Sequence, residues 1–284
     1  MTIENKYNFN EIGFKLIDIA KMVLGSSDFR DEVLQRGGKQ DIVSLADQEI
    51  EERAFDYIKS IKFPANFHGE EKRQRKLVDN PKYLICFDPQ DGTNNSVDEA
   101  LHYCTIPTIF DTTEPRNLGS AVWTGIYDHV SREMAYFDNN KVYFSRDGKP
   151  IQPKTRNVKS LDDIPDNSYI DLILDIGPKE TPEKLKPFSE ILSKSWRKNV
   201  SCAGYHMLLI AMGKRDAYIC PVQKPEELVA GIPLIESVGG KVITFDGRRA
   251  GDLPYDFDSR YQIIATRVPK LADDLSNRVY LPLF

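Results

Sequence analysis

The sequence predicts a layered fold in which helices pack against β-sheets, with an α+β first half and an α/β second half. Apolar runs of strand length and segments of helical periodicity recur along the 284 residues. In the first half, several of the strands are joined by short turns, which is typical of an antiparallel meander. After a polar stretch at 152–167, strands and helices alternate, and this order indicates helices layered on a sheet. We expect two domains, residues 1–155 and 156–284.

The first half is predicted to contain two helices and six strands. Residues 9–24 have helical spacing and end at Gly25, and a second helix runs from about Asp47 to Lys62. The expected strands, rich in β-branched and aromatic residues, are 65–68, 83–87, 103–110, 118–127, 133–137 and 141–144. Pro107 lies within one of these strands and predicts an edge position or a bulge, because proline has no N–H to donate to a sheet.

The second half is predicted to alternate between strands and helices. The expected strands are 169–174, 216–220, 241–245 and 261–266, and the expected helices are 182–194, 201–212, 225–238 and a final segment from Pro269. Gly213 and Gly239–Gly240 follow two of these helices, where glycine commonly ends a helix. In layered α/β folds, strand ends and helix starts converge on one rim, which is the usual place for a ligand.

The composition excludes several classes of protein. The chain is 40% hydrophobic and 29% charged, and a net charge of -5 argues against a nucleic-acid partner. No apolar run approaches the ~20 residues of a membrane span, and the first 25 residues lack the apolar core of a signal peptide. Widely spaced cysteines predict small core residues and neither a disulfide framework nor a zinc site: Cys86, Cys104, Cys202 and Cys220. We expect a cytoplasmic protein without a membrane or nucleic-acid partner.

The candidate site centres on Asp88-Pro89-Gln90-Asp91-Gly92-Thr93, which follows the apolar run 83–87. Two carboxylates three residues apart supply the oxygen ligands that a hard cation prefers, and the N–H groups of Gly92 and Thr93 suit a phosphate. Asp, Pro and Gly are also common in ordinary turns. The motif alone therefore does not separate a ligand site from a turn at the end of a strand.

Further acidic residues stand at other strand ends and helix starts: Asp47, Glu70 with Glu71, and Glu226 with Glu227. Each has an ordinary alternative, either as an acid in the first turn of a helix or as part of a solvated loop. If the fold brings these carboxylates to one rim, they repel each other unless cations lie among them. Ligation by oxygen alone indicates Mg²⁺ or Mn²⁺.

Taken in order, these motifs resemble the inositol monophosphatase family, within the larger group that includes fructose-1,6-bisphosphatases and 3′-phosphoadenosine 5′-phosphate phosphatases. The resemblance spans about residues 10–270. Four stretches carry it: Asp41–Asp47 (D-x-V-T-x-x-D in the family), Gly69–Glu71 (G-E-E), Asp88–Thr93 (D-P-x-D-G-T), and Asp216–Tyr218 with Glu226–Gly231 (D-A-Y … W-D-x-A-A-G).

The resemblance implies a five-layered αβαβα sandwich of the sugar phosphatase type, with mixed sheets and helices between and outside them. The N-terminal domain would carry the metal motifs, and the C-terminal domain would contribute the substrate pocket and one metal ligand. The implied activity is that of a Mg²⁺-dependent phosphomonoesterase, with Mn²⁺ as a second metal, acting on a small polyol or sugar phosphate by in-line attack of a metal-activated water. Inositol 1-phosphate and fructose 1,6-bisphosphate are the substrates that it suggests, and a homodimer is the implied assembly.

The resemblance also implies a role for each matching residue. The expected metal ligands are Glu70, Asp88, the carbonyl of Gln90, Asp91 and Glu227. The expected catalytic residues are Asp47 and Thr93, which would orient and deprotonate the attacking water, together with Glu70. The residues expected to bind phosphate and substrate are Gly92, Thr93, Ser201, Cys202, Ala203 and Glu227.

The chain departs from the family pattern in three places. Glu226 and Glu227 replace the Trp and Asp of the last motif, so either glutamate is a candidate ligand. Cys220 falls where inositol-specific members have an acidic residue, which argues against inositol, and Asn94 with Asn95 replaces Thr-Asn or Phe-Asn. Two alternatives stay open at this point. One is a nucleotide 3′-phosphatase of the adenosine bisphosphate type with Tyr205 and His206 near the base, and the other is a non-catalytic relative that binds metal or sugar phosphate.

Overall fold

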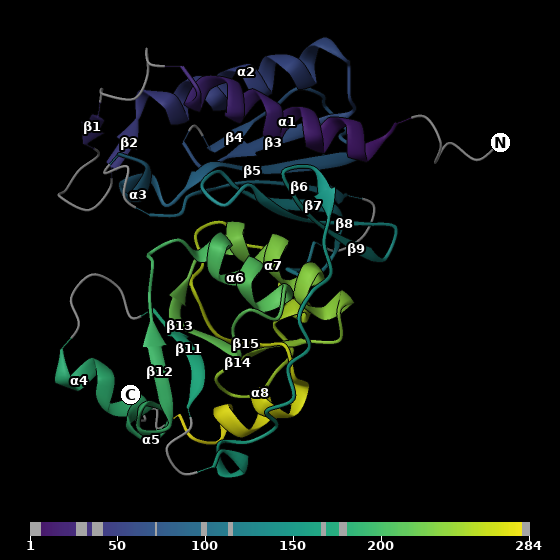
Figure 1. Cartoon of the computed structure of the whole chain (residues 1–284). Helices are drawn as coiled ribbons and strands as arrows, with labels where there is room; N and C mark the ends of the chain where they lie inside the picture. The colour runs from purple at the N-terminus through teal and green to yellow at the C-terminus, as the bar shows by residue number, and fades with distance from the viewer. Residues whose placement is uncertain are drawn as a thin grey trace.

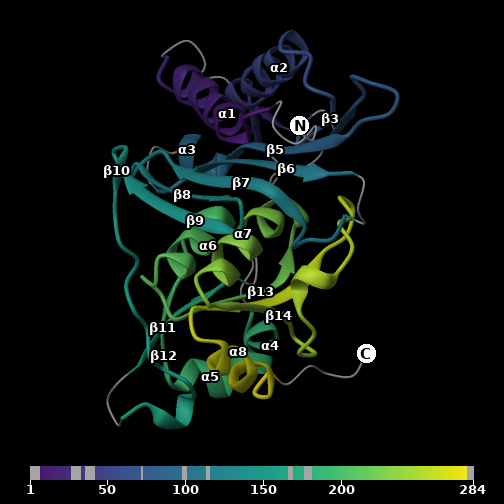
Figure 2. The same cartoon turned by 90° about the vertical axis from the view of Figure 1, so that its right-hand side faces the viewer.

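The computed structural model describes residues 7–26, 33–35, 42–71, 73–97, 101–112, 116–165, 169–175 and 181–279. Helices and sheets stack in five layers, as Figures 1 and 2 show. The outer layer holds α1 (Phe9–Leu24) and α2 (Leu45–Ser60), the middle layer α6 (Ala203–Ala211) and α7 (Pro225–Ser237), and the far layer α4 (Pro182–Leu185), α5 (Ser189–Ser193) and α8 (Pro269–Ser276). The predicted αβαβα sandwich is confirmed. None of the described helices is long and apolar enough to cross a bilayer.

The larger sheet has eight strands in the order β10-β9-β8-β7-β6-β5-β3-β4. Its members are β3 (Ala65–Gly69), β4 (Arg73–Arg75), β5 (Tyr83–Asp91), β6 (Cys104–Asp111), β7 (Ala121–Asp128), β8 (Glu133–Asp138), β9 (Lys141–Arg146) and β10 (Lys149–Pro150). The strands from β5 to β10 pair antiparallel in chain order and form the predicted meander. The pair β3 and β5 is parallel, so both strands end at the same edge of the sheet.

The smaller sheet has five strands in the order β12-β11-β13-β15-β14. They are β11 (Ile170–Leu174), β12 (Ser195–Lys198), β13 (Ala217–Gln223), β14 (Lys241–Thr244) and β15 (Tyr261–Thr266). β11 runs parallel to both of its neighbours, whereas β15 is antiparallel to β13 and β14. The remaining elements are a short pair, β1 (Val33–Gln35) with β2 (Ile42–Ser44), the one-turn helix α3 (Thr93–Val97), and 3₁₀ turns at Leu161–Asp163, Lys186–Phe188 and Ala250–Asp252.

The two middle helices are buried because a sheet covers them on either side. α7 has no charged residue between Glu227 and Glu236, and its side chains from Leu228 to Ile235 are buried. A helix that is apolar all round is typical of such a position. All four cysteines are buried and none forms a disulfide, as the composition predicted. The middle layer thus fixes the distance between the two sheets.

Pro107 was expected at an edge position or at a bulge. β6, which contains it, is an internal strand between β5 and β7, so the edge alternative was wrong. Its ladder with β7 does shift register between Ile109 and Phe110, as the bulge alternative allows. One predicted helix was also wrong. The predicted helix 182–194 is divided into α4, a 3₁₀ turn and α5. Pro187 lies in that turn, where a continuous helix would require the N–H that proline lacks.

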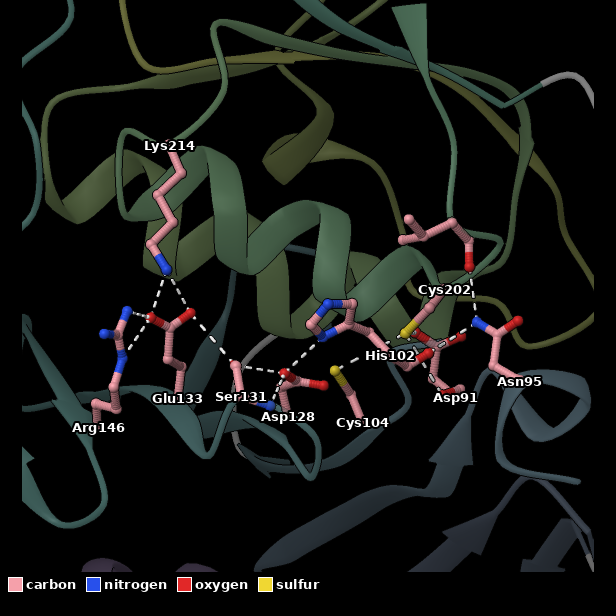
Figure 3. Close-up of polar contacts among 11 residues, drawn as sticks. Asp91, Asn95, His102, Cys104, Asp128, Ser131, Glu133, Arg146, Cys202 and Lys214 are labelled. Carbon is pink, nitrogen blue, oxygen red and sulfur yellow. Dashed lines mark hydrogen bonds and ion pairs between the residues drawn. The ribbon is translucent and has the colours of Figure 1, made fainter. Parts of the chain in front are cut away.

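An ion cluster joins the large sheet to the end of α6. Glu133 on β8 is fully buried, and its carboxylate accepts hydrogen bonds from Lys214, just after α6, and from Arg146 on β9. The Ser131 N–H donates to Asp128 Oδ2 at 2.8 Å, and the Ser131 hydroxyl lies within hydrogen-bond distance of both Asp128 and Glu133, as Figure 3 shows. Burial raises the pKa of Glu133, but the hydrogen bonds and charges of Lys214 and Arg146 lower it by more. The net pKa is therefore below its ordinary value. The cluster holds the middle layer against the large sheet.

We expect Lys214→Met to destabilise the protein by about 2–3 kcal/mol, because a buried carboxylate would lose one of its two cations. Urea unfolding at neutral pH measures this loss, with Lys149→Met on the exposed strand β10 as the matched control. Since the folded-state pKa of Glu133 is lowered, the contribution is present above its ordinary pKa of 4.5 and fades as the pH falls below it. Equal unfolding midpoints for the two variants at neutral pH would contradict this role.

Candidate active site

The first wall of the site is formed where β3 and β5 end together. Gly69 lies opposite Phe87 in the parallel register, and the N–H of Glu70 donates to the Phe87 carbonyl at 3.1 Å. This hydrogen bond holds Glu70 beside the start of the Asp88–Thr93 motif. A Cβ on Gly69 would lie 2.2 Å from the carboxyl carbon of Glu51, so any larger residue there would displace that carboxylate. The structure therefore brings Glu70 and Asp88 to one rim, as the sequence predicted.

The Asp88–Thr93 motif continues β5 and then turns sharply. The strand runs to Asp91, beyond the expected end at Phe87, with an irregular register between Asp88 and Asp91. The Asp88 carboxylate accepts a hydrogen bond from the N–H of Gln90 at 2.9 Å, and the Thr93 hydroxyl donates to the Gln90 carbonyl at 3.0 Å. Gly92 has φ +86, a left-handed conformation that glycine adopts without strain. The turn is thus closed by its own hydrogen bonds.

The start of α6 supplies the second wall. The N–H of Gly204 donates to Asp91 Oδ2, and the thiol of Cys202 lies 3.2 Å from the same oxygen. Ser201, just before this helix, has φ +50, which is uncommon for a residue with a Cβ. A side-chain amide ties this loop to the large sheet, because Asn95 Nδ2 donates to the carbonyls of His102 and Val200 at 2.7 and 2.6 Å, as Figure 3 shows.

The third wall is the start of α7. Glu227 is buried in its first turn, and its carboxylate accepts a hydrogen bond from Gln223 Nε2 at 3.1 Å. The hydroxyl of Tyr218 donates to Gln223 Oε1 at 2.6 Å, so a chain of two hydrogen bonds orients Glu227. Tyr218 belongs to the D-A-Y motif, whereas no motif in the sequence pointed to Gln223. Such supporting partners commonly orient carboxylates in metal sites.

These walls enclose a cavity of about 170 Å³. It is lined by Glu70, Asp88, Gln90, Asp91, Gly92, Thr93, Asn94, Ser201, Lys224 and Glu227. Asp88, Asp91 and Glu227 each place one oxygen within 4.8 Å of the others. Three buried carboxylates at this spacing, without a sulfur or imidazole ligand among them, are the donor set of a hard divalent cation such as Mg²⁺ or Mn²⁺.

Burial and mutual repulsion raise the pKa values of the clustered carboxyls. The pKa of Asp88 lies well above its ordinary value through burial and then through the charges of Glu70 and Asp91. Burial also raises the pKa of Asp91 to about 6, against the lowering effect of the Gly204 hydrogen bond, and raises that of Glu227 well above the ordinary range. The cluster is therefore costly to ionise without a cation.

Some predicted site residues lie outside the cavity lining. Asp47 is buried in the first turn of α2, and Cys202 and Ala203 lie behind Ser201, where Cys202 contacts Asp91. Glu226 is buried but is not part of the carboxylate cluster, which includes Glu227. Two other residues discussed from the sequence are not among the described residues that line the cavity. Cys220 is buried on β13 and does not line it, and Asp41 lies outside the described residues.

Two charged residues that were not predicted from the sequence also shape the site. Lys224 caps α7, and its Nζ lies 2.7 Å from Glu70 Oε1 inside the cavity. Glu51, fully buried on α2, accepts a hydrogen bond from the N–H of Glu71 at 2.8 Å and so supports the turn that carries Glu70. The sequence feature that could have indicated Lys224 is its position directly before Pro225, Glu226 and Glu227. Nothing in the spacing of Glu51 indicated its partner, which lies 20 residues further along the chain.

Comparison with known proteins identifies the family. The sequence model described as "Inositol monophosphatase family" matches residues 7–279. The chain belongs to the inositol monophosphatase family. Inositol monophosphatase 1 of Saccharomyces cerevisiae is 26% identical over 243 residues, which cover 81% of this chain and 78% of that protein. Inositol monophosphatase 1 of Homo sapiens is also 26% identical, over 259 residues that cover 87% of this chain and 84% of the human protein.

Solved structures show the same fold. The crystal structure described as "IMPase/NADP phosphatase complexed with Mg2+ and phosphate" superposes with a TM-score of 0.74 at 16% identity, covering 96% of this chain and 95% of that one. As a member of the inositol monophosphatase family, the protein is a phosphatase that hydrolyses phosphate monoesters. The family is metal-dependent, and the carboxylate cluster of this chain fits that chemistry. Membership favours the enzymatic interpretation over the non-catalytic alternative.

The carboxylate cluster predicts an unusual pH dependence of stability for this family member after treatment with EDTA. The pKa values of Asp91 and Glu226 are raised to about 6 and about 7. A raised carboxyl pKa means that the native state binds protons more tightly than the unfolded chain. These groups therefore add to the free energy of unfolding as the pH falls through about 7 and about 6. Their contribution levels off once the pH reaches their ordinary pKa values of 3.8 and 4.5.

Glu227→Gln tests this explanation. Without metal at about pH 8, the variant should be more stable than the wild type by on the order of 1 kcal/mol, because a neutral amide neither repels the neighbouring carboxylates nor needs to take up a proton, and it can still contact Gln223. Urea unfolding at about pH 8 and about pH 5.5 measures the difference, which should shrink at the lower pH. Leu228→Ala, at a fully buried neighbour, should instead destabilise at both pH values. A Glu227→Gln variant less stable than wild type at pH 8 would refute electrostatic repulsion as the dominant effect.

Proposed function

We propose that this phosphatase is a Mg²⁺-dependent phosphomonoesterase that acts on a small polyol or sugar phosphate, with inositol 1-phosphate and fructose 1,6-bisphosphate as the first candidates. The observation that carries the proposal is the cavity in which Asp88, Asp91 and Glu227 converge next to the turn at Gly92 and Thr93. The carboxylates suit a divalent cation, with Mn²⁺ as the second choice, and the adjacent N–H groups suit the phosphate that the cation would share.

Asp88, Asp91 and Glu227 would hold the metal, and Glu70 and the Gln90 carbonyl border the same cavity as further predicted ligands. When bound, the metal supplies Lewis-acid chemistry, in that it lowers the pKa of a water and neutralises charge on the phosphoryl oxygens. The chain's own contribution to this part of the site is a rigid set of oxygens. Gly204 and Gln223 fix Asp91 and Glu227 from outside the cavity, so the ligands need little reorganisation.

The turn after Asp91 would orient the phosphate and the attacking water. The first N–H groups of a helix lack partners within it, so those of Gly92 and Thr93 at the start of α3 can donate to phosphate oxygens. The Thr93 hydroxyl donates its proton to the Gln90 carbonyl. The hydroxyl oxygen can therefore still accept a hydrogen bond from a water. Asp47 as the proton acceptor of that water stays a prediction from the resemblance.

The alcohol part of the substrate would face Ser201 and Asn94, two polar residues that line the same cavity. Cys220 does not line the cavity, so it offers no contact to substrate hydroxyls. The small volume of about 170 Å³ favours a compact leaving group. A homodimer in the cytoplasm is part of the proposal and rests on the resemblance and composition.

One observation bears on the nucleotide alternative. A second cavity of about 120 Å³, beside Ser201, is lined by Tyr205 and His206 among others. His102 already stacks on the Tyr205 ring, with centroids 3.7 Å apart, and its Nδ1 lies 2.8 Å from the buried carboxylate of Asp128. A base could stack on that face of Tyr205 only after His102 moves. Adenosine 5′-phosphate should therefore compete weakly with a sugar phosphate, and strong competition would favour the nucleotide 3′-phosphatase.

Asp91→Asn tests the metal and phosphate site directly. Substitution of groups that only support metal ligands typically costs about 10–100-fold, so loss of Asp91 itself should lower kcat by more than about a hundredfold. The readout is phosphate release from a panel containing inositol 1-phosphate and fructose 1,6-bisphosphate, with Mg²⁺ or Mn²⁺ present. Circular dichroism would verify that the variant is folded.

Asn94→Ala is the matched control for this experiment, because Asn94 lines the cavity but is exposed and lies outside the carboxylate cluster. It should change KM more than kcat. Phosphate release by the wild type that persists in excess EDTA would refute the metal-dependent mechanism, as would Asp91→Asn with unchanged kcat.

A further inference from the structure

A lysine lies inside the acidic cavity, among the residues predicted to bind metal. Lys224 Nζ is 2.7 Å from Glu70 Oε1, and Lys224 lines the same cavity as Asp88, Asp91 and Glu227. It is the only basic residue among those that line this cavity in the described chain. The cavity therefore already contains one positive charge before any metal is bound.

The backbone is restrained on both sides of this ion pair. Lys224 is the N-cap of α7, and Pro225 at the first helical position restricts the backbone that follows it. Glu70 is fixed by the hydrogen bond from its N–H to the Phe87 carbonyl. A lysine side chain is an ammonium ion at neutral pH by its ordinary pKa, and here it lies at ion-pair distance from a carboxylate.

The lysine divides the carboxylates of the cavity into two sets. Asp88, Asp91 and Glu227 form the cluster whose oxygens lie within 4.8 Å of one another, and Glu70 is not part of it. Glu70 instead forms an ion pair with Lys224. A cation bound beside Glu70 would have to displace this ammonium group or lie against it, and two cations at that distance repel each other.

We propose that Lys224 is a built-in cation that takes the place of one divalent ion beside Glu70, so that the cavity binds a single metal ion at Asp88, Asp91 and Glu227. Glu70, predicted above as a metal ligand, would then pair with the lysine instead. This inference rests on the proposed metal-dependent function and deepens it, because it specifies the metal count of the site. It also assigns Lys224 a positioning role, since the ammonium group holds Glu70 at the rim and balances the cluster while no metal is bound.

Counting bound ions on the metal-stripped full chain tests the proposal. Mn²⁺ titration followed by electron paramagnetic resonance should give one tightly bound ion per wild-type chain and two for Lys224→Met. Lys224→Arg keeps the charge and should bind one ion. Lys149→Met, which removes an exposed lysine on β10, should also bind one and controls for the change in net charge.

Stability without metal provides an independent readout. Lys224→Met and Lys224→Gln should unfold at a lower urea concentration than wild type in EDTA at about pH 8, because four carboxylates would lose their only lining cation. Saturating Mn²⁺ should recover most of the stability that these two variants lose. Lys224→Arg should resemble the wild type. A lysine that forms only a surface ion pair would change stability by at most about 1 kcal/mol with or without metal.

Two ions bound to the wild type, or one ion bound to both Lys224→Met and Lys224→Gln, would overturn the proposal. So would an unchanged unfolding midpoint for both variants in EDTA. The proposed function fails separately, through the absence of phosphate release from the wild type with Mg²⁺ and Mn²⁺ alike. If counting and stability follow the expected pattern while no ester is hydrolysed, the role of Lys224 stands and the catalytic proposal falls.

Discussion

The arrangement of this protein depends on the convergence of like charges in a buried place. Asp88 and Asp91 end a central strand of the large sheet, and Glu227 begins a helix that two sheets cover. Groups of one sign at this spacing are stable only when cations or hydrogen-bond donors face them. The donors here come from the backbone of Gly204 and the side chain of Gln223. The sandwich thus supplies oriented partners for charges that a simpler core would exclude.

The sequence was informative wherever the relevant contact followed from local pattern or from strand direction. The shared rim of Glu70 and Asp88 could be predicted, because strand ends in a layered α/β fold converge on one rim, and Gly69 does lie opposite Phe87. The contact of Lys224 with Glu70 could not, because the two residues are 154 positions apart and meet only when the two halves dock. The internal position of Pro107 was missed for a similar reason, since the order of strands in a sheet is a tertiary property.

Helix α6 connects the two halves at both of its ends. At its start, Gly204 and Cys202 contact Asp91, and just past its end Lys214 contacts Glu133 on β8. Figure 3 shows both attachments along one line of polar contacts between the helix and the large sheet. A helix held at both ends cannot slide along the sheet without breaking a buried polar contact. The width of the cavity is therefore set by polar contacts as well as by apolar packing.

The long sequence separation between the walls of the cavity also has a consequence for folding. The large sheet is complete by residue 150, whereas α7 begins at residue 225, so each half can form its own sheet before the acidic groups meet. Closing such long segments is slow compared with local pairing. We therefore expect docking of α7 onto the end of β5 to be a late event in refolding, and it is the event that brings the carboxylates together.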